Sequence, residues 1–153
     1  MDERLDIVIV PFEPPDEPGF RALVAGTLRE FDFEPDPDFD PDLDDPAAVY
    51  SMLWIARAGA DVVGSVALRD LGDGVLELKR MYLSPSYRGR GLGRRLLSTA
   101  LEWARAGGVR KIRLDTTEEM QAARHLYEAY GFRRIPGEAP RQGQQRLLYE
   151  LTL

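Results

Sequence analysis

The chain has 153 residues, of which 44% are hydrophobic, a size and composition that predict a single globular domain spanning residues 1–153. It contains no cysteine, which excludes disulfides, thiolate metal ligands and a cysteine nucleophile. Its formal net charge of −6 argues against nucleic acid as a partner.

The chain begins with a predicted strand and a predicted helix. Residues 5–10 form a β-rich run that Pro11 stops, and this acidic N-terminus lacks the basic and apolar regions of a secretion signal. No run approaches the roughly 18 apolar residues of a membrane-spanning helix, so we expect a cytoplasmic protein without a membrane partner. Hydrophobic residues at helical spacing predict a helix over residues 20–31, after a proline-rich segment.

A strongly acidic segment follows this helix. Nine Asp or Glu residues and no Lys or Arg lie between Glu30 and Asp45, and four prolines within residues 32–46 exclude a regular helix or a central strand. The alternating aspartates lack the glycine and the terminal glutamate of an EF-hand loop, so we predict no metal site. The composition predicts a loop that covers a binding site. A solvated acidic surface is the alternative.

The remainder of the chain alternates strands and helices. Residues 50–57 and 61–69 predict a β-hairpin, and residues 75–83 predict a strand that Pro85 ends. The patterns then predict a helix over 91–106, a strand over 109–114, a helix over 119–130, and strands over 132–135 and 146–153. This order of elements predicts an α/β (α+β) fold.

Residues 87–97 read YRGRGLGRRLL and place glycines and arginines at the start of a predicted helix. A helix N-terminus exposes unpaired N–H groups and partial positive charge, which together suit an anion. Glycine allows the backbone to approach the anion closely, and arginine matches phosphate oxygens. The spacing differs from the P-loop and from the G-x-G-x-x-G fingerprint. The loop therefore predicts a phosphate site of another kind, with an ordinary arginine-rich helix start as the alternative.

This loop is one of two motifs that occur in order. R-x-x-G-x-G at residues 88–93 follows the strand ELKRMYLSP, and AARHLYEAYGF occupies residues 122–132. The first motif resembles the pyrophosphate loop of the GNAT superfamily of acyl-CoA N-acyltransferases, and the second resembles that family's signature A-x-x-L-Y-E-x-x-G-F. The resemblance is firmest over residues 50–135. It implies a mixed, mostly antiparallel central sheet of six or seven strands flanked by helices.

The resemblance also implies acetyl-CoA as the co-substrate, without a metal. The pantetheine arm would run beside the central strand and pair with the backbone of Met81, Tyr82 and Leu83, where one N–H group would polarise the thioester carbonyl. The pyrophosphate would lie on the loop, whose residues are Arg88, Gly89, Arg90, Gly91, Leu92, Gly93 and Arg94.

Two residues match catalytic positions of the family. Tyr127 matches the tyrosine general acid, and tyrosine, with a pKa of about 10, is protonated at neutral pH and able to donate; core packing is its alternative role. Glu77 matches a position where some members place a glutamate general base, and an ion pair with Lys79 or another base is the alternative, with water as the base. We expect Glu77, Lys79 and Met81 to share one face of the strand.

Met120 stands where the second signature usually has an asparagine, which implies the loss of one side-chain contact to the cofactor. His125, the only histidine, is expected to be exposed. Neither a G-x-S-x-G motif nor a histidine-based triad is present.

The sequence thus predicts an N-acetyltransferase that passes the acetyl group of acetyl-CoA directly to a primary amine of a small molecule or a peptide. A non-catalytic acyl-CoA-binding or sensing module on the same fold is the alternative. The acidic segment favours a cationic acceptor, such as a polyamine or a lysine side chain. Leu147, Tyr149 and Leu151 share one face of the last predicted strand, and we expect that this strand could pair or pack across a homodimer.

Overall fold

The computed structural model describes residues 6–118, 120–137 and 146–153. Its strands are β1 (Ile7–Pro11), β2 (Met52–Ala58), β3 (Asp61–Gly72), β4 (Val75–Leu83), β5 (Lys111–Thr116), β6 (Arg133–Ile135) and β7 (Leu147–Thr152). Its helices are α1 (Glu17–Glu30), α2 (Pro46–Val49), α3 (Leu92–Ala106) and α4 (Gln121–Ala129), with 3-10 turns η2 (Pro14–Asp16), η3 (Pro41–Leu43) and η4 (Pro85–Tyr87). Each predicted element is present, although Leu5 and Glu119, where two of them were expected to begin, lie outside the described residues. None of the described helices is long and apolar enough to cross a membrane.

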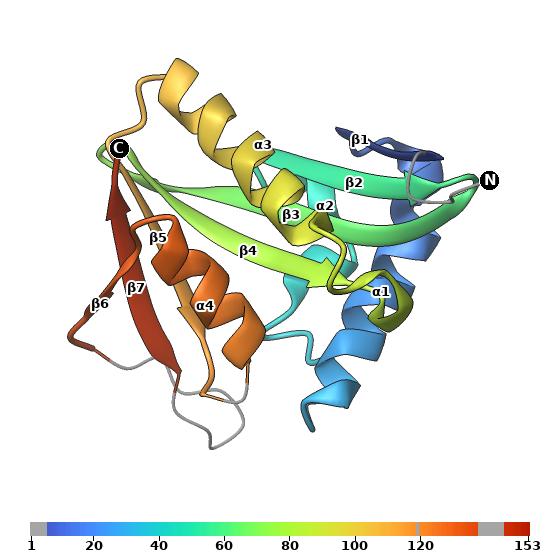
Figure 1. Cartoon of the computed structure of the whole chain (residues 1–153). Coiled ribbons are helices and arrows are strands. Elements are labelled where there is room, and N and C mark those ends of the chain that lie inside the picture. Colours follow the sequence, from blue (N-terminus) through green and yellow to red (C-terminus); the bar gives the residue numbers. More distant parts are fainter. Residues whose placement is uncertain (1–5, 119, 138–145) are drawn as a thin grey trace.

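The seven strands form one sheet in the order β1-β2-β3-β4-β5-β7-β6 (Figure 1). All neighbours are antiparallel except β4 and β5, which run parallel. Parallel neighbours need a long crossover connection, and α3 provides it between these two strands. The predicted mixed, mostly antiparallel sheet flanked by helices is confirmed.

Helices cover both faces of the sheet (Figure 1). On one face, α3 and α4 pack over a core to which α3 contributes Leu96 and Leu101. On the other face, α1 packs over a second core through Phe20 and Val24. Full burial of each such side chain stabilises the fold by about 1.5–3 kcal/mol, so the two cores hold the sheet between the helices.

Local signals set the helix ends. α1 begins at Glu17, earlier than the predicted residue 20, because Pro18 lies in the first turn, where its missing N–H has no partner to lose. α3 begins at Leu92 after Gly91, whose φ is 83°, and ends at Gly107. Both ends of α3 are within one residue of the prediction.

β7 lies inside the sheet, between β5 and β6. Leu147, Tyr149 and Leu151 share one face, as expected, but each is at most 9% exposed and belongs to the core that α3 and α4 cover. Because this face is filled within the chain, it cannot pack across a homodimer. Packing through this face is therefore wrong as a basis for a homodimer, and a homodimer itself stays a prediction.

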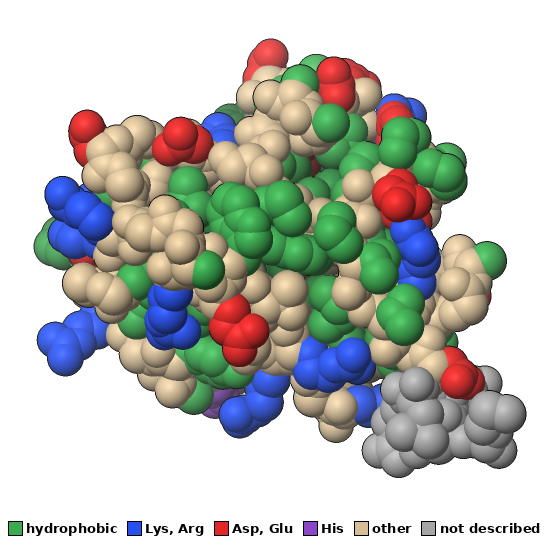
Figure 2. Space-filling view, turned by 90° about the horizontal axis from the view of Figure 1, so that it is seen from above, with side chains coloured by type: hydrophobic (Ala, Val, Ile, Leu, Met, Phe, Trp, Pro, Cys, Tyr) green, Lys and Arg blue, Asp and Glu red, His purple; other side chains and the backbone are tan. Residues whose placement is uncertain are grey.

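Figure 2 looks down from above the view of Figure 1 and shows hydrophobic side chains gathered in the middle of that face. Trp103 of α3 is 40% exposed and packs edge-on against the buried Trp54 of β2, with ring centroids 5.9 Å apart. Such edge-to-face pairs add to the stability gained from burial. The two rings close the core between α3 and β2.

Candidate active site

β4 and β5 separate after a short stretch of pairing. Their parallel register joins Val75–Glu77 to Lys111–Arg113, yet the strands continue to Leu83 and Thr116 (Figure 1). Two cavities open at this gap, one of about 570 Å³, here called the sheet cavity, and one of about 440 Å³, here called the loop cavity. Both cavities are lined by Met81, Tyr82, Met120 and Ala123. A ligand in one cavity therefore lies next to a ligand in the other.

The loop cavity lies between the end of β4, the glycine–arginine loop and the first turns of α4. Gly89 and Gly91 have φ values of 76° and 83°, in the left-handed region that favours glycine. The N–H groups of the first turn of α3 have no acceptor within the helix, and no described side chain caps this end. The start of α3 thus presents free N–H groups and partial positive charge to the cavity, as a phosphate site requires.

Arg88 ties the loop to the rest of the protein. Its guanidinium donates to the carboxylate of Glu30 at 2.6 and 2.7 Å and to the carbonyl of Leu83 at 3.0 and 3.1 Å. These hydrogen bonds lower the pKa of the Glu30 carboxyl. Arg88 lines the loop cavity, but its charge is already paired with an acid of α1.

The other three arginines of the loop have different surroundings. Arg95 donates to the carbonyl of Ile7 in β1 at 3.2 Å, and neither residue lines the loop cavity. The guanidinium of Arg90 lies over the ring of Tyr87, 5.8 Å from its centroid. Arg94 lines the loop cavity. No described carboxylate forms an ion pair with Arg90 or Arg94, so Arg94 offers the cavity an unpaired positive charge.

The sheet cavity lies in the gap between β4 and β5 and extends to α4 and β7. Its polar and aromatic lining comprises Glu77, Lys79, Arg80, Tyr82, Arg113, Asp115, Thr116, Tyr127, Arg146 and Tyr149. The acidic segment contributes Phe39 to the wall, and none of its acidic residues from Glu30 to Asp45 lines either cavity.

Tyr127 of α4 stands on the wall of the sheet cavity and is 6% exposed. Its ring packs against Phe132 with centroids 5.7 Å apart. Burial, reinforced by Tyr82 and Asp115, raises the pKa of Tyr127 well above its ordinary value. Its hydroxyl therefore stays protonated at neutral and mildly alkaline pH, and no described residue hydrogen-bonds to it. The structure thus combines core packing of the ring with a protonated hydroxyl.

Glu77 lines the sheet cavity opposite Arg69 of β3 in the strand register. The Arg69 Nη2 atom lies 2.8 Å from Glu77 Oε1. This contact is an ion pair without hydrogen-bond alignment, because Glu77 Oε1 has no hydrogen-bond partner among the described residues. The ion pair that the sequence left as an alternative is therefore present, with Arg69 in place of Lys79. A role as base requires Glu77 to take up a proton beside this guanidinium.

β4 carries a bulge at Arg80. Ser65 and Ala67 of β3 pair with Tyr82 and Lys79, so β4 has one residue more than β3 between these two pairs. Arg80 has a φ of 53°. This left-handed conformation costs a non-glycine residue roughly 1–2 kcal/mol, so other contacts must stabilise it.

The bulge changes which side chains share a face of β4. Leu78 and Met81 both pack in the core that α3 covers, whereas Tyr82 packs in the core that α1 covers. In a regular strand, Leu78 and Met81 would point to opposite faces, since they are an odd number of residues apart. The expectation that Met81 shares a face with Glu77 and Lys79 is therefore wrong.

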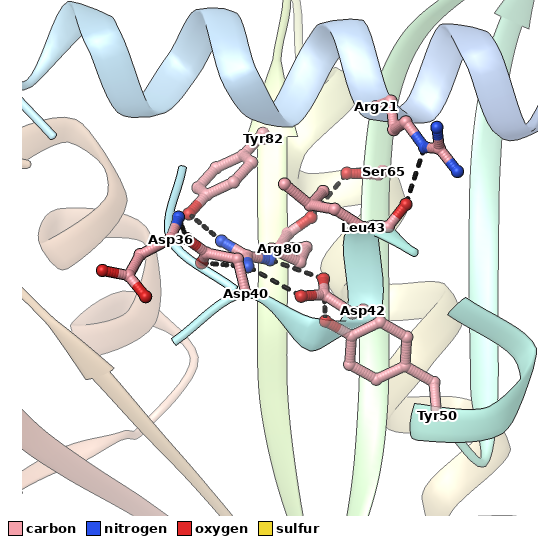
Figure 3. A network of polar contacts seen from close by, with 9 residues as sticks. All are labelled: Arg21, Asp36, Asp40, Asp42, Leu43, Tyr50, Ser65, Arg80 and Tyr82. Atoms are coloured by element: carbon pink, nitrogen blue, oxygen red, sulfur yellow. Dashed lines mark hydrogen bonds and ion pairs between the residues drawn. The ribbon is translucent and has the colours of Figure 1, made fainter. Parts of the chain in front are cut away.

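The side chain of Arg80 is buried among residues of the acidic segment (Figure 3). Nε and Nη2 donate to Asp42 at 2.8 and 2.9 Å, and Nη2 donates to Asp40 at 2.6 Å. The hydroxyl of Tyr50 also donates to Asp42. Burial acts to raise the pKa of Asp42, but the hydrogen bonds and charge of Arg80 outweigh it and lower that pKa. Asp42 therefore remains a buried carboxylate.

These contacts change the interpretation of the acidic segment. Asp40 and Asp42 are paired with Arg80, Glu30 is paired with Arg88, and the Asp45 side chain accepts the N–H of Ala48 at the start of α2. The segment is thus held against the protein by its acids. Sequence spacing could not reveal this role of Arg80, because its partners lie 38 and 40 positions away along the chain.

Three further expectations concern Met120, His125 and metal binding. Met120 lines both cavities, and its Sδ atom accepts the Thr116 hydroxyl at 3.5 Å. His125 is exposed, as expected, at the rim of the loop cavity. Within residues 6–118, 120–137 and 146–153, no group of three or more His, Asp or Glu side chains is arranged to hold a metal ion.

The two cavities adjoin, and one of them is suited to a phosphate-bearing ligand. Comparison with known proteins identifies the class more closely. The model of the acetyltransferase (GNAT) family matches residues 19–132. The chain belongs to this family and is an acyltransferase.

The relatives agree with this assignment. An uncharacterized N-acetyltransferase of Escherichia coli, YjgM, is 32% identical over 130 residues, which cover 78% of each chain. N-acetylaspartate synthetase of Xenopus tropicalis is 40% identical over 86 residues, which cover 56% of this chain and 32% of that protein. The similarity therefore covers more than three quarters of both chains for the first relative, whereas it covers about one third of the second relative.

Solved structures show the same fold. An acetyltransferase from Streptococcus agalactiae aligns with a TM-score of 0.85 and 26% identity, over 97% of this chain and 99% of that one. The acetyltransferase yncA from Salmonella typhimurium, solved with its cofactor acetyl-CoA, aligns with a TM-score of 0.75 and 18% identity, over 95% and 93% of the two chains. This second likeness concerns the fold alone.

Proposed function

We propose that the chain is an acetyl-CoA-dependent N-acetyltransferase that passes the acetyl group directly to a primary amine. The observation that carries the proposal is the meeting of the loop cavity and the sheet cavity at Met81 and Tyr82. The first has the free N–H groups and the unpaired Arg94 that a pyrophosphate needs, and the second leaves room for an acceptor. Membership of the acetyltransferase family supports acetyl-CoA as the donor.

In this proposal the pantetheine arm lies along the backbone of β4 at Met81, Tyr82 and Leu83. The pyrophosphate lies on the loop and the first turn of α3, over residues 88–94. Arg94 and the N–H groups then bind the phosphates directly, whereas Arg88 holds the loop to α1 through Glu30. Arg94 and Arg88 have these different roles because an arginine already paired with a carboxylate gains less from binding a phosphate.

The chemistry needs proton transfers at the acceptor nitrogen and at the leaving sulfur. The acceptor ammonium first loses a proton, to Glu77 or to water, and the free amine attacks the thioester carbonyl. An N–H group of β4 stabilises the oxyanion that forms. As the C–N bond forms and the C–S bond breaks, Tyr127 donates a proton to the leaving CoA sulfur. The nitrogen gives up its remaining surplus proton to solvent, and solvent reprotonates Tyr127. The tyrosine is available for this step because its hydroxyl is protonated at neutral pH and no described residue hydrogen-bonds to it.

The charges of the sheet cavity bear on the acceptor. The acids that motivated a cationic acceptor line neither cavity, and a cationic acceptor stays a prediction. Lys79 lines the sheet cavity and is its only basic lining residue without an ion pair to a described carboxylate. A half-buried ammonium of this kind favours an anionic partner. We therefore propose an acceptor that carries an acidic group near its amine, as does the aspartate in the name of the relative N-acetylaspartate synthetase.

A panel of amines tests both the reaction and the acceptor. Polyamines, neutral amines and amino acids are incubated with acetyl-CoA at low salt, and release of the CoA thiol is followed. We expect turnover, with carboxylate-bearing amines used better than polyamines. Faster turnover of polyamines would contradict the acceptor class. Binding of acetyl-CoA without turnover of any amine would favour the non-catalytic sensing module.

A cytoplasmic location remains a prediction, which cell fractionation tests.

A further inference from the structure

Arg80 lies in the β4 bulge, and contacts from two directions hold it. Its φ of 53° is one that a non-glycine residue keeps only when its surroundings impose it. The Ser65 hydroxyl of β3 donates to the Arg80 carbonyl at 2.6 Å. The carboxylates of Asp40 and Asp42 hold the guanidinium from the opposite side (Figure 3). The backbone and the side chain of this residue are therefore both fixed.

The residues after the bulge lie where the two cavities meet. Met81 and Tyr82 follow Arg80 directly and line both cavities. Because peptide units are rigid, the φ and ψ angles of Arg80 set the directions of the N–H groups that follow it. Under the proposed function, the thioester carbonyl lies at this junction. The conformation of Arg80 therefore controls how that carbonyl is hydrogen-bonded.

The same ion pairs hold a wall of the sheet cavity. Phe39 lines this cavity and immediately precedes Asp40 in the chain. Asp40 is also bound to its own segment, since it accepts the N–H of Asp36 at 2.7 Å. A single guanidinium thus connects the acceptor side of the site to the backbone on the donor side.

We propose that Arg80 is a positioning residue, which together with Asp40 and Asp42 orients the two reactants. The cluster holds the bulge so that an N–H group of the following residues points at the thioester carbonyl. It also holds the wall that contains Phe39 against the acceptor. This inference rests on the proposed function, and it gives the acidic segment a role in alignment.

NMR of bound [1-¹³C]acetyl-CoA tests the inference without knowledge of the acceptor. A hydrogen bond to a thioester carbonyl moves its ¹³C resonance downfield, so we expect this displacement in the wild-type complex relative to free acetyl-CoA. Arg80→Lys keeps the charge but loses the two-pronged geometry. We expect this variant to lose at least half of the displacement and, with an accepted amine, about 10²-fold in kcat, while its Kd for CoA changes less than about threefold.

A second ion pair, between Arg57 and Asp16, offers a matched control. Arg57 holds Asp16 through Nε and Nη2, both at 2.8 Å, and lines neither cavity. Arg57→Lys breaks the same type of two-pronged contact. We expect it to keep the wild-type resonance and the wild-type kcat, so that any effect of Arg80→Lys belongs to its place on β4.

The outcomes separate this inference from the proposed function. A folded Arg80→Lys protein with the wild-type resonance and kcat overturns the positioning role. If that variant does not fold, Asp42→Asn decides: a reduced displacement supports the role, and the wild-type resonance overturns it. If the wild-type protein does not bind acetyl-CoA, the proposed function fails and this inference fails with it.

Discussion

Replacing Tyr127 with phenylalanine removes one hydroxyl and leaves the ring in place. The ring keeps its contact with Phe132, and no described residue loses a hydrogen-bond partner. We therefore expect the free energy of unfolding to change by less than about 0.5 kcal/mol. Loss of a general acid lowers kcat by about 10²–10⁴-fold. At about 1.36 kcal/mol per tenfold, this is a loss of about 2.7–5.4 kcal/mol of transition-state stabilisation.

The pH dependence provides a second test of the same residue. Since burial raises the pKa of Tyr127, the acid remains protonated as the pH passes about 10, the ordinary pKa of tyrosine. Deprotonation of Tyr127 should therefore not lower the wild-type kcat up to a pH of about 10. The assay follows CoA release with an accepted amine across pH, and circular dichroism confirms that both proteins are folded. A Tyr127→Phe variant with the wild-type kcat and intact CoA binding would refute the acid role and leave core packing as the function of the ring.

Two further predictions concern charge. Arg94→Ala should weaken CoA binding by about tenfold or more at low salt, as loss of a charged hydrogen bond to phosphate does, and calorimetry should show no change for Arg105→Ala, on the same helix but outside the loop cavity. Burial acts to raise the pKa of Asp16, but hydrogen bonds from Arg57 outweigh it and leave that pKa below 3.8. The paired carboxylate therefore contributes stability above pH 3.8 that is lost as the pH falls through the lower folded pKa. Urea unfolding should show Asp16→Asn less stable than the wild type near neutral pH, with the gap narrowing in acid; an equal gap at every pH, or the same behaviour in the exposed Asp61→Asn, would contradict this.

Much of the fold could be predicted from local pattern. The sequence predicted a strand over residues 75–83 that Pro85 ends, and β4 has the same bounds. Apolar spacing and the glycine pair Gly107 and Gly108 placed α3 within one residue. These features depend on neighbours along the chain, and for that reason one sequence suffices to find them.

Contacts between distant segments could not be predicted in this way. The ion pair of Glu77 with Arg69 follows from strand register. The hydrogen bond between Arg80 and Asp40 joins residues about forty positions apart. At the bulge, Arg80 has a positive φ. Arginine is not a residue type that indicates this conformation, so the sequence did not predict the bulge. Counting charge along the chain therefore suggested a cation-attracting loop, whereas tertiary contacts pair two of its acids with the single guanidinium of Arg80.

Calorimetry with acetyl-CoA, CoA and ATP tests the central claim most directly. We expect micromolar binding of acetyl-CoA and CoA but not of ATP, because the loop cavity and the β4 backbone together recognise the pyrophosphate and the pantetheine arm. Failure of both CoA ligands to bind would contradict the account and return the glycine–arginine loop to an ordinary helix start.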